Sequence, residues 1–320
     1  IYFMNTDQLH SVYFIGIGGI GMSALARYFH ANNKRVAGYD KTQTENTDSL
    51  VDIGIAIHYE DSMSNVDAVF LDYETTLVVY TPAIPNNHEE LSYFKNQKNF
   101  QVLKRSEVLG LITENTFCLA VAGTHGKTTT SSILAHVLYS MPDACNAFIG
   151  GITSNYDSNC IIDAKAKRVV VEADEFDRSF LQLKPNFAII TTMDSDHLDI
   201  YGDATNFKDG FRQYAMKIDP NGCCVMHEDV SLPSLCESVT YAIDSETADY
   251  RASCIKYVDG VMQFVVNTPQ INAKKFTLQI PGLHNVLNAL ACIALLDKIG
   301  LPMQNIQQGL NSFKGVRRRF

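Results

Sequence analysis

Residues 121–130 combine the residue types that bind a nucleoside triphosphate. They read Val-Ala-Gly-Thr-His-Gly-Lys-Thr-Thr-Thr, follow an apolar run over residues 117–122 and precede a helix-forming segment. In a phosphate-binding loop, backbone N–H groups and the helix N-terminus face the anion, the lysine contacts the β- and γ-phosphates, and the next hydroxyl coordinates Mg²⁺. We therefore predict a P-loop, defined here as Gly123–Gly126, with Lys127 and Thr128 directly after it.

The match to the usual motif is incomplete, because Val121 stands where the first glycine normally falls. Gly123 would take over that role in a tighter loop. The alternative is a glycine-rich turn before a helix with a lysine there by chance, but the flanking strand and helix are the context that the motif requires. The predicted nucleotide contacts in this segment are Gly123, Thr124, His125, Gly126, Lys127, Thr128 and Thr129.

An acidic cluster, Glu-Ala-Asp-Glu at residues 172–175, directly follows the apolar run 169–171. Ligands of open α/β sheets bind beyond the carboxyl ends of the strands. A carboxylate at that place can hold the Mg²⁺ that bridges two phosphates of a nucleotide. We favour Glu172 over Asp174 as the metal ligand; the alternative is an acidic helix cap.

A third polar cluster, Asp-Ser-Asp-His-Leu-Asp at residues 194–199, follows a strand-like run over residues 187–193. Any one of its residues could be a solvated cap. Because the cluster coincides with the P-loop and the acidic cluster, we predict a second cation site with His197 as its strongest ligand.

Another glycine-rich loop lies nearer the N-terminus. Residues 11–15 form an apolar run, residues 16–21 read Gly-Ile-Gly-Gly-Ile-Gly, and helix-forming residues follow. Strand, G-x-G-x-x-G and helix in this order are typical of a Rossmann-type pyrophosphate loop. A further strand-like run, residues 35–39, ends at Asp40, an acid at about the right spacing to contact a ribose.

The two loops divide the chain into two predicted domains. Apolar strands that alternate with helices indicate a mainly parallel sheet covered on both faces. We predict an α/β fold with a Rossmann-like N-terminal domain at residues 1–113. A P-loop central domain at residues 114–314 would combine a mainly parallel sheet with a smaller β-rich part. Residues 68–71 and 77–80 are further predicted strands of the first domain.

Composition excludes several functional classes. The chain has 26 Lys and Arg against 35 Asp and Glu, a formal net charge of −9, which argues against a nucleic-acid-binding surface. Its eight cysteines include no CxxC pair, so we predict reduced thiols in a cytoplasmic protein. No segment is long and apolar enough to predict membrane insertion.

Four motifs occur in an order that resembles the Mur ligases of peptidoglycan synthesis. They are Gly-Thr-His-Gly-Lys-Thr-Thr-Thr, Glu-Ala-Asp-Glu-x-Asp, Asp-His-x-Asp and His-Asn-x-x-Asn, and the resemblance runs from about Ser11 to Phe320. It implies an ATP-dependent ligase that joins L-alanine to the lactyl carboxylate of UDP-N-acetylmuramic acid through an acyl phosphate. ATP and Mg²⁺ are the implied cofactors.

The resemblance also implies roles for individual residues. The implied catalytic residues are Lys127, Glu172 and His197, and the implied Mg²⁺ ligands are Thr128, Glu172 and His197. Implied ATP contacts outside the P-loop are Asn285, Asn288 and Arg318. On pattern alone the two asparagines are caps or packing residues, although an asparagine can also hydrogen-bond a purine edge. The implied contacts of the UDP-sugar are Gly18, Gly19, Gly21, Met22, Asp40 and Thr81.

Three departures from the family pattern qualify these expectations. Arg212 stands where several members carry a carbamylated lysine, and residues 81–84 read Thr-Pro-Ala-Ile in place of Ser-Ser-Ala-Ile. Residues 315–320 match the start of the linker to a third domain that presents the amino acid. That domain is absent from this sequence, so we expect the chain to bind its nucleotides without ligating them.

Other functions remain as alternatives. A nicotinamide dehydrogenase would explain the first glycine loop and Asp40, but not Gly-Lys-Thr. A P-loop switch or motor would leave the first domain without a role. Within the family, a recycling ligase that attaches a whole peptide to the same UDP-sugar would share these domains.

Overall fold

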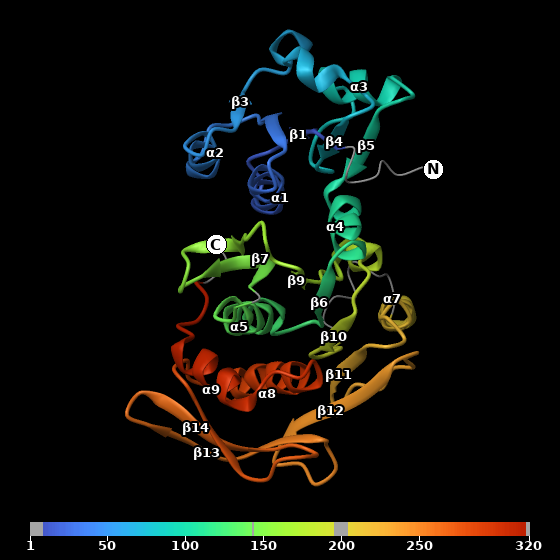
Figure 1. Ribbon diagram of the computed structural model, residues 1–320. Coiled ribbons are helices and arrows are strands. Elements are labelled where there is room, and N and C mark those ends of the chain that lie inside the picture. Colours follow the sequence, from blue (N-terminus) through green and yellow to red (C-terminus); the bar gives the residue numbers. More distant parts are fainter. Residues whose placement is uncertain (1–8, 143, 195–203, 318–320) are drawn as a thin grey trace. The chain divides into compact units, whose positions relative to one another are not determined.

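The computed structural model describes residues 9–142, 144–194 and 204–317. The chain divides between Leu109 and Gly110 into two compact units, called unit 1 and unit 2 below. Helix α4 (Arg105–Glu114) carries the chain from the first unit into the second (Figure 1).

Unit 1 contains a five-stranded sheet in the order β3-β2-β1-β4-β5, with every strand parallel to its neighbours. The order of the strands along the chain reverses between β1 and β4. In open α/β sheets this switch point is where ligands bind, beyond the carboxyl ends of the strands. The strands are β1 (Ser11–Ile15), β2 (Arg35–Tyr39), β3 (Ala56–His58), β4 (Thr76–Tyr80) and β5 (Gln101–Lys104).

The strands of unit 1 are linked by α1 (Ile20–Ala31), α2 (Glu45–Val51), η1 (Met63–Asn65), η2 (Ala68–Leu71) and α3 (Glu89–Asn96). The prediction of a strand at residues 68–71 was wrong, because these residues form the 3₁₀ helix η2. The Asp67 side chain accepts a hydrogen bond from the Val69 N–H at 3.0 Å and so starts the turn. A local side-chain bond of this kind competes with strand formation in a way that an apolar pattern does not reveal.

Unit 2 is built on a ten-stranded mixed sheet in the order β15-β14-β13-β12-β11-β10-β6-β9-β7-β8. The strands from β7 to β13 in this order pair in parallel, while β8, β14 and β15 are antiparallel to their neighbours. The strands are β6 (Phe117–Ala122), β7 (Cys145–Thr153), β8 (Ser158–Ile161), β9 (Arg168–Glu172), β10 (Phe187–Ile190), β11 (Cys223–His227), β12 (Glu237–Ile243), β13 (Tyr250–Val258), β14 (Val261–Asn267) and β15 (Lys274–Leu278).

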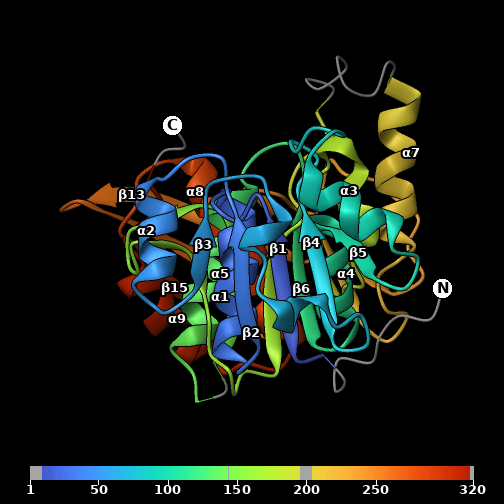
Figure 2. The same ribbon diagram turned by 90° about the horizontal axis from the view of Figure 1, so that it is seen from above.

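Helices cover both faces of the parallel part of this sheet. Helices α5 and α7 lie on opposite sides of β6 and β10, and α8 runs between α5 and the long strands β13 and β14 (Figures 1 and 2). Helix α8 is buried from Asn288 to Leu296 and joins α5 in the core of unit 2. The helices are α5 (Lys127–Tyr139), η3 (Phe176–Gln182), α7 (Ala204–Ala215), α8 (Leu283–Lys298) and α9 (Met303–Ser312).

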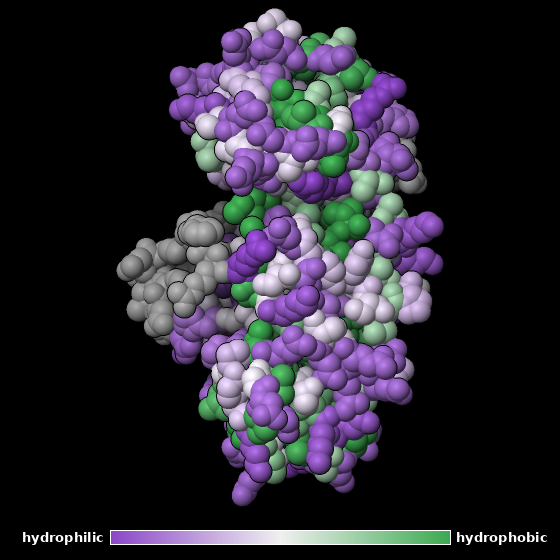
Figure 3. Space-filling model, turned by 90° about the vertical axis from the view of Figure 1, so that its left-hand side faces the viewer, coloured by the Kyte–Doolittle hydropathy of each residue, from purple (hydrophilic) through white to green (hydrophobic). Residues whose placement is uncertain are grey.

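The predicted α/β class with a mainly parallel sheet is confirmed. Strands predicted at residues 11–15, 35–39 and 117–122 have those bounds in the structure, whereas the strand predicted at 187–193 ends at Ile190. All eight cysteines are free thiols. The face shown in Figure 3 is mostly hydrophilic, with hydrophobic side chains in small groups. No helix among the described residues has the length and apolar character to cross a membrane.

Candidate functional site

The P-loop joins the end of β6 to the first turn of α5. Gly123 and Gly126 have φ angles of +132° and +80°, which favour glycine. A Cβ atom on Gly123 would collide with Thr191 Oγ1, and one on Gly126 would lie 2.5 Å from Asn288 Oδ1. No side chain caps the N-terminus of α5. The loop therefore has the backbone form and the uncapped helix end of an anion site.

Two threonines that follow β10 brace the P-loop. The Thr124 N–H donates to Thr192 O at 3.0 Å, and the two threonine hydroxyls lie 2.7 Å apart. The Thr191 hydroxyl donates to His125 O at 2.5 Å. Sequence reasoning assigned Thr191 and Thr192 to a strand and missed this role. Their position at the carboxyl end of a strand that neighbours β6 was the signal that could have revealed it.

Lys127 is bonded to oxygen atoms of this chain. Its Nζ lies 2.7 Å from Gly123 O, and 2.9 Å and 2.8 Å from Oε1 and Oε2 of Glu175. The Lys127 and Glu175 side chains are only 12% and 5% exposed. Glu175 belongs to the acidic cluster after β9, but sequence reasoning gave it no function.

Thr128 and Glu172 lie side by side, as a magnesium site would require. The Thr128 hydroxyl donates to Glu172 Oε1 at 2.9 Å, and the Gly150 N–H donates to Glu172 Oε2 at 2.6 Å. A hydroxyl and a carboxylate are oxygen ligands of the kind that Mg²⁺ prefers, so this pair fits the ion. Among the described residues, no three His, Cys, Asp or Glu side chains gather as a metal site.

The two predicted adenine contacts have different surroundings. Asn288 is 7% exposed and faces the P-loop at Gly126. Asn285, one turn earlier on α8, donates from Nδ2 to Pro281 O at 2.6 Å. The structure thus brings Asn288 to the loop, whereas Asn285 is bonded to the chain segment that leads into its own helix.

The other residues predicted in unit 2 divide into those outside the described residues and those within them. His197 and Arg318 belong to the first group. His125 lies 3.8 Å from Asp194, and both side chains are more than half exposed, which makes this a weak surface pair. Thr129 lies in the first turn of α5. Arg212 is an exposed residue of α7 and lines a pocket of about 500 Å³ with Asp209, Gln213, Met216, Lys217 and Pro233.

In unit 1 the loop Gly16–Gly21 joins β1 to α1. Gly16 has a φ of +88°, and the N–H groups of Gly16 and Ile17 donate to Tyr39 O at 2.8 and 2.9 Å. The Gly18 N–H donates to Asp40 Oδ2 at 2.7 Å. The predicted acid at the end of β2 therefore contacts the glycine loop itself. No side chain caps the N-terminus of α1.

The remaining residues predicted to bind the UDP-sugar surround this loop. Thr81 follows β4 and packs so closely that its Cγ2 would lie 2.6 Å from a Cβ on Gly16. A Cβ on Gly21 would lie 2.9 Å from the Arg105 side chain, whereas one on Gly19 would meet no atom closer than 3.8 Å. Met22 is 2% exposed, so its side chain belongs to the interior of unit 1.

A buried polar chain lies among β1, β3 and α3 of unit 1. The Tyr13 hydroxyl lies 2.8 Å from Glu90 Oε2 and 2.7 Å from His58 Nε2. Glu90 is fully buried, and burial raises its pKa to about 7. Burial lowers the pKa of His58 below its ordinary value.

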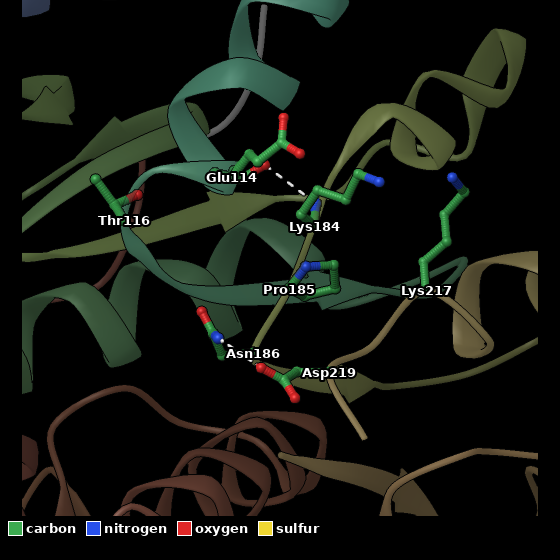
Figure 4. A pocket seen from close by; sticks show the side chains of 8 residues that line it. Glu114, Thr116, Lys184, Pro185, Asn186, Lys217 and Asp219 are labelled. Carbon is green, nitrogen blue, oxygen red and sulfur yellow. Dashed lines mark hydrogen bonds between the residues drawn. The ribbon is translucent and has the colours of Figure 1, made fainter. Parts of the chain in front are cut away.

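A pocket of about 260 Å³ opens at the amino ends of β6, β10 and β11 (Figure 4). Two lysines, Lys184 and Lys217, are matched there by the acids Glu114 and Asp219, and Asn186 Nδ2 donates to Asp219 Oδ2 at 3.2 Å. The P-loop, Glu172 and the bracing threonines all lie at the opposite, carboxyl ends of neighbouring strands. The carboxyl edge is where such sheets bind ligands, so we take it as the functional site.

Two family descriptions match the chain. Residues 11–116 match the Mur ligase family, catalytic domain, and residues 121–296 match the Mur ligase middle domain. The matched regions contain both glycine loops, the acidic cluster after β9 and the two asparagines of α8.

Individual relatives agree with these matches. The chain is 51% identical over 320 residues to a UDP-N-acetylmuramate–L-alanine ligase of Flavobacterium psychrophilum, covering 99% of this chain and 69% of the relative. It is 46% identical to the protein of that name from Cytophaga hutchinsonii, with the same shares covered. The crystal structure of UDP-N-acetylmuramate-alanine ligase from Thermotoga maritima has a TM-score of 0.80 at 31% identity, covering 97% of this chain and 70% of that one. The chain belongs to the Mur ligase family.

Proposed function

We propose that this chain serves the ATP-dependent joining of L-alanine to the lactyl carboxylate of UDP-N-acetylmuramic acid. The observation that carries the proposal is the arrangement of Lys127, Thr128 and Glu172 at the carboxyl ends of adjacent parallel strands. It supports use of a nucleoside triphosphate, and the identity of 51% over 99% of the chain supports the substrates named for the relative.

Joining a carboxylate to an amine requires a better leaving group on the carboxylate. Attack of the lactyl carboxylate on the γ-phosphorus of ATP gives an acyl phosphate and releases ADP. The amine of L-alanine then attacks the acyl carbon, loses a proton and expels phosphate. Both reactants of the first step are anions, so charge compensation and alignment dominate the catalysis. Lys127 would bind the β- and γ-phosphates, and the N–H groups of the P-loop would orient them.

Thr128 and Glu172 would hold Mg²⁺, with His197 as a further ligand. The ion would supply charge compensation between the phosphate oxygens. Glu172 is already held in place by the Gly150 N–H and the Thr128 hydroxyl. Asn288 would bind the adenine edge beside the loop, with Asn285 and Arg318 as further contacts.

In unit 1, Gly18, Gly19 and Gly21 would present the backbone to the pyrophosphate of the UDP-sugar, with Asp40, Met22 and Thr81 around it. Gly19 supports this role, since a Cβ there would meet no protein atom closer than 3.8 Å. Among the described residues, none packs closely against that position, which leaves the backbone there accessible to a pyrophosphate.

We favour L-alanine over a whole peptide as the second substrate. The relatives that are 45–51% identical carry the L-alanine ligase name. The UDP-N-acetylmuramate:L-alanyl-γ-D-glutamyl-meso-diaminopimelate ligase of Neisseria meningitidis shares the fold with a TM-score of 0.82, but at only 23% identity. A dehydrogenase explains neither the P-loop nor the family match. We place the activity in the cytoplasm, where the free thiols of this chain would stay reduced.

Phosphate release by the complete natural protein tests this function. Release from Mg·ATP should require both UDP-N-acetylmuramic acid and an acceptor. L-Alanine should support it far better than glycine, D-alanine or the free tripeptide L-alanyl-γ-D-glutamyl-meso-diaminopimelate. UDP-N-acetylglucosamine, which lacks the lactyl carboxylate, is the matched control. Release that is independent of the lactyl group, or stronger with the tripeptide, would contradict the proposal.

A further inference from the structure

The Lys127 ammonium has its hydrogen-bonding needs met by the chain itself. An ammonium group has three N–H donors. Nζ donates to Gly123 O at 2.7 Å, to Glu175 Oε1 at 2.9 Å and to Thr124 O at 3.4 Å, and Glu175 Oε2 completes the ion pair at 2.8 Å. A phosphate oxygen can therefore reach the ammonium only if it displaces one of these partners.

The carboxylate of Glu175 is the partner that a phosphate would displace. Gly123 O is part of the loop backbone, while Glu175 contributes a side chain that can rotate. Its backbone is anchored, because the Arg178 N–H donates to Glu175 O at 3.1 Å and the Phe180 N–H donates to Asp174 O at 3.0 Å. Phe180 in turn is 1% exposed and stacks on Tyr214 with ring centroids 4.9 Å apart.

Charge determines whether metal-free ATP or Mg·ATP displaces Glu175 from Lys127 more readily. Both side chains are nearly buried, so their mutual attraction is only weakly screened by water. A triphosphate without a cation would bring further negative charge against Glu175. A triphosphate with Mg²⁺ brings compensating charge to Thr128 and Glu172, next to the same loop.

We propose that Glu175 is a positioning residue that occupies the γ-phosphate place on Lys127 and yields it to Mg·ATP in preference to metal-free ATP. This rests on the proposed use of ATP and goes beyond it, because it assigns a function to a carboxylate of the acidic cluster that the metal site does not require. Glu175 keeps Lys127 oriented in the empty loop and lowers the affinity for nucleotide that arrives without its cation.

Calorimetry with the non-hydrolysable analogue AMP-PNP tests the proposal on the whole chain. Glu175→Gln should bind metal-free AMP-PNP about tenfold more tightly than the wild type, because a competing state that is populated about ten to one lowers affinity by that factor. With saturating Mg²⁺ the gain should shrink to about twofold. Glu237→Gln is the matched control: Glu237 is paired with Lys298 at 2.6 Å on the surface, so its replacement should change neither affinity.

A Lys127→Met background shows whether the effect acts through the lysine. There, Glu175→Gln should tighten binding of metal-free AMP-PNP by clearly less than tenfold, since no ammonium remains to be released. Glu175→Asp withdraws the carboxylate from Nζ but keeps its charge, and should give an intermediate gain. It also tests the proposal if the glutamine variant fails to fold.

Three results would overturn the inference. The first is unchanged or weaker AMP-PNP binding by Glu175→Gln in the absence of Mg²⁺. The second is an equal gain with and without Mg²⁺, and the third is an equal gain in the Lys127→Met background. Each of these leaves the proposed ATP use intact, provided that the wild type binds Mg·AMP-PNP. Absence of that binding in every variant would overturn the proposed function as well.

Discussion

The two glycine loops of this chain resemble each other in form and differ in charge. Each follows a buried parallel strand, contains a glycine with positive φ and begins a helix that no side chain caps. A carboxylate of the same unit lies at each: Asp40 accepts from the Gly18 N–H in unit 1, and Glu175 pairs with Lys127, directly after the loop, in unit 2. Only the second loop adds a lysine and a neighbouring Thr–Glu pair.

This difference separates binding from chemistry. Backbone N–H groups suffice to hold a pyrophosphate that does not react. Transfer of a phosphoryl group needs positive charge positioned where negative charge accumulates in the transition state. A lysine and a metal ion provide that charge. We therefore expect the loop of unit 1 to hold the UDP-sugar and that of unit 2 to carry out catalysis.

The largest expected effect is that of Lys127→Met. Hydrogen bonds to charged groups contribute about 1.5–3 kcal/mol, so affinity for Mg·AMP-PNP should fall by roughly 10- to 150-fold. The variant also removes the ammonium that is paired with the nearly buried Glu175 and should lower the melting temperature. Calorimetry should show unchanged binding of UDP-N-acetylmuramic acid. If Lys127→Met lost binding of both Mg·AMP-PNP and UDP-N-acetylmuramic acid, the two loops would not be separate binding sites.

The glycines of unit 1 should show the reverse selectivity. A side chain at Gly18 would come within 2.8 Å of both Asp40 and Thr47, so Gly18→Val should abolish UDP-sugar binding and destabilise the unit. The Gly19→Ala methyl meets no atom of the described residues closer than 3.8 Å, so it should leave the melting temperature unchanged while weakening the UDP-sugar about tenfold. Normal UDP-sugar affinity in Gly19→Ala would show that the pyrophosphate lies elsewhere.

Glu172→Gln tests whether the carboxylate at the end of β9 binds Mg²⁺ beside the P-loop. Its amide can still accept from the Thr128 hydroxyl but carries no charge for Mg²⁺. We expect Mg·AMP-PNP to bind about tenfold more weakly and metal-free AMP-PNP to bind unchanged. Calorimetry at two Mg²⁺ concentrations measures both. An equal loss in the two conditions would make Glu172 a structural brace for Gly150.

A pH dependence of stability is expected from the buried Glu90 of unit 1. The raised pKa of Glu90, about 7, means that the folded state holds a proton that the unfolded state releases near pH 4.5. Stability should therefore fall as pH rises from about 4.5 to 7. Burial lowers the pKa values of His58 and His88. Their contribution therefore makes the stability of the folded state rise with pH in the range just below pH 6.5.

Comparison of Glu90→Gln with the wild type isolates the carboxyl contribution. The variant should gain on the order of 2 kcal/mol of unfolding free energy relative to the wild type between pH 5 and pH 8. Chemical denaturation at the two pH values measures it. Asp61 and Glu89 add negative charge near Glu90, so their charge should be held constant in the comparison. A constant difference across this range would show that Glu90 is ionised throughout.

Much of this organisation could be predicted from the sequence. The strands before both loops begin and end at the predicted residues, because an apolar run interrupted by glycine leaves few alternatives. The 3₁₀ helix at residues 68–71 could not be predicted, since it depends on one bond from Asp67. Glu175 lay in a motif that was noticed, but its pairing with Lys127 joins residues that are 48 positions apart, and only the folded sheet brings them together.

The central claim is that the two loops bind different nucleotides at the same time. Calorimetric titration of UDP-N-acetylmuramic acid into wild-type chain saturated with Mg·AMP-PNP tests it directly. We predict binding of one UDP-sugar per chain with the analogue still bound, as shown by a separate titration in the reverse order. Competition between the two ligands for a single site would contradict the account.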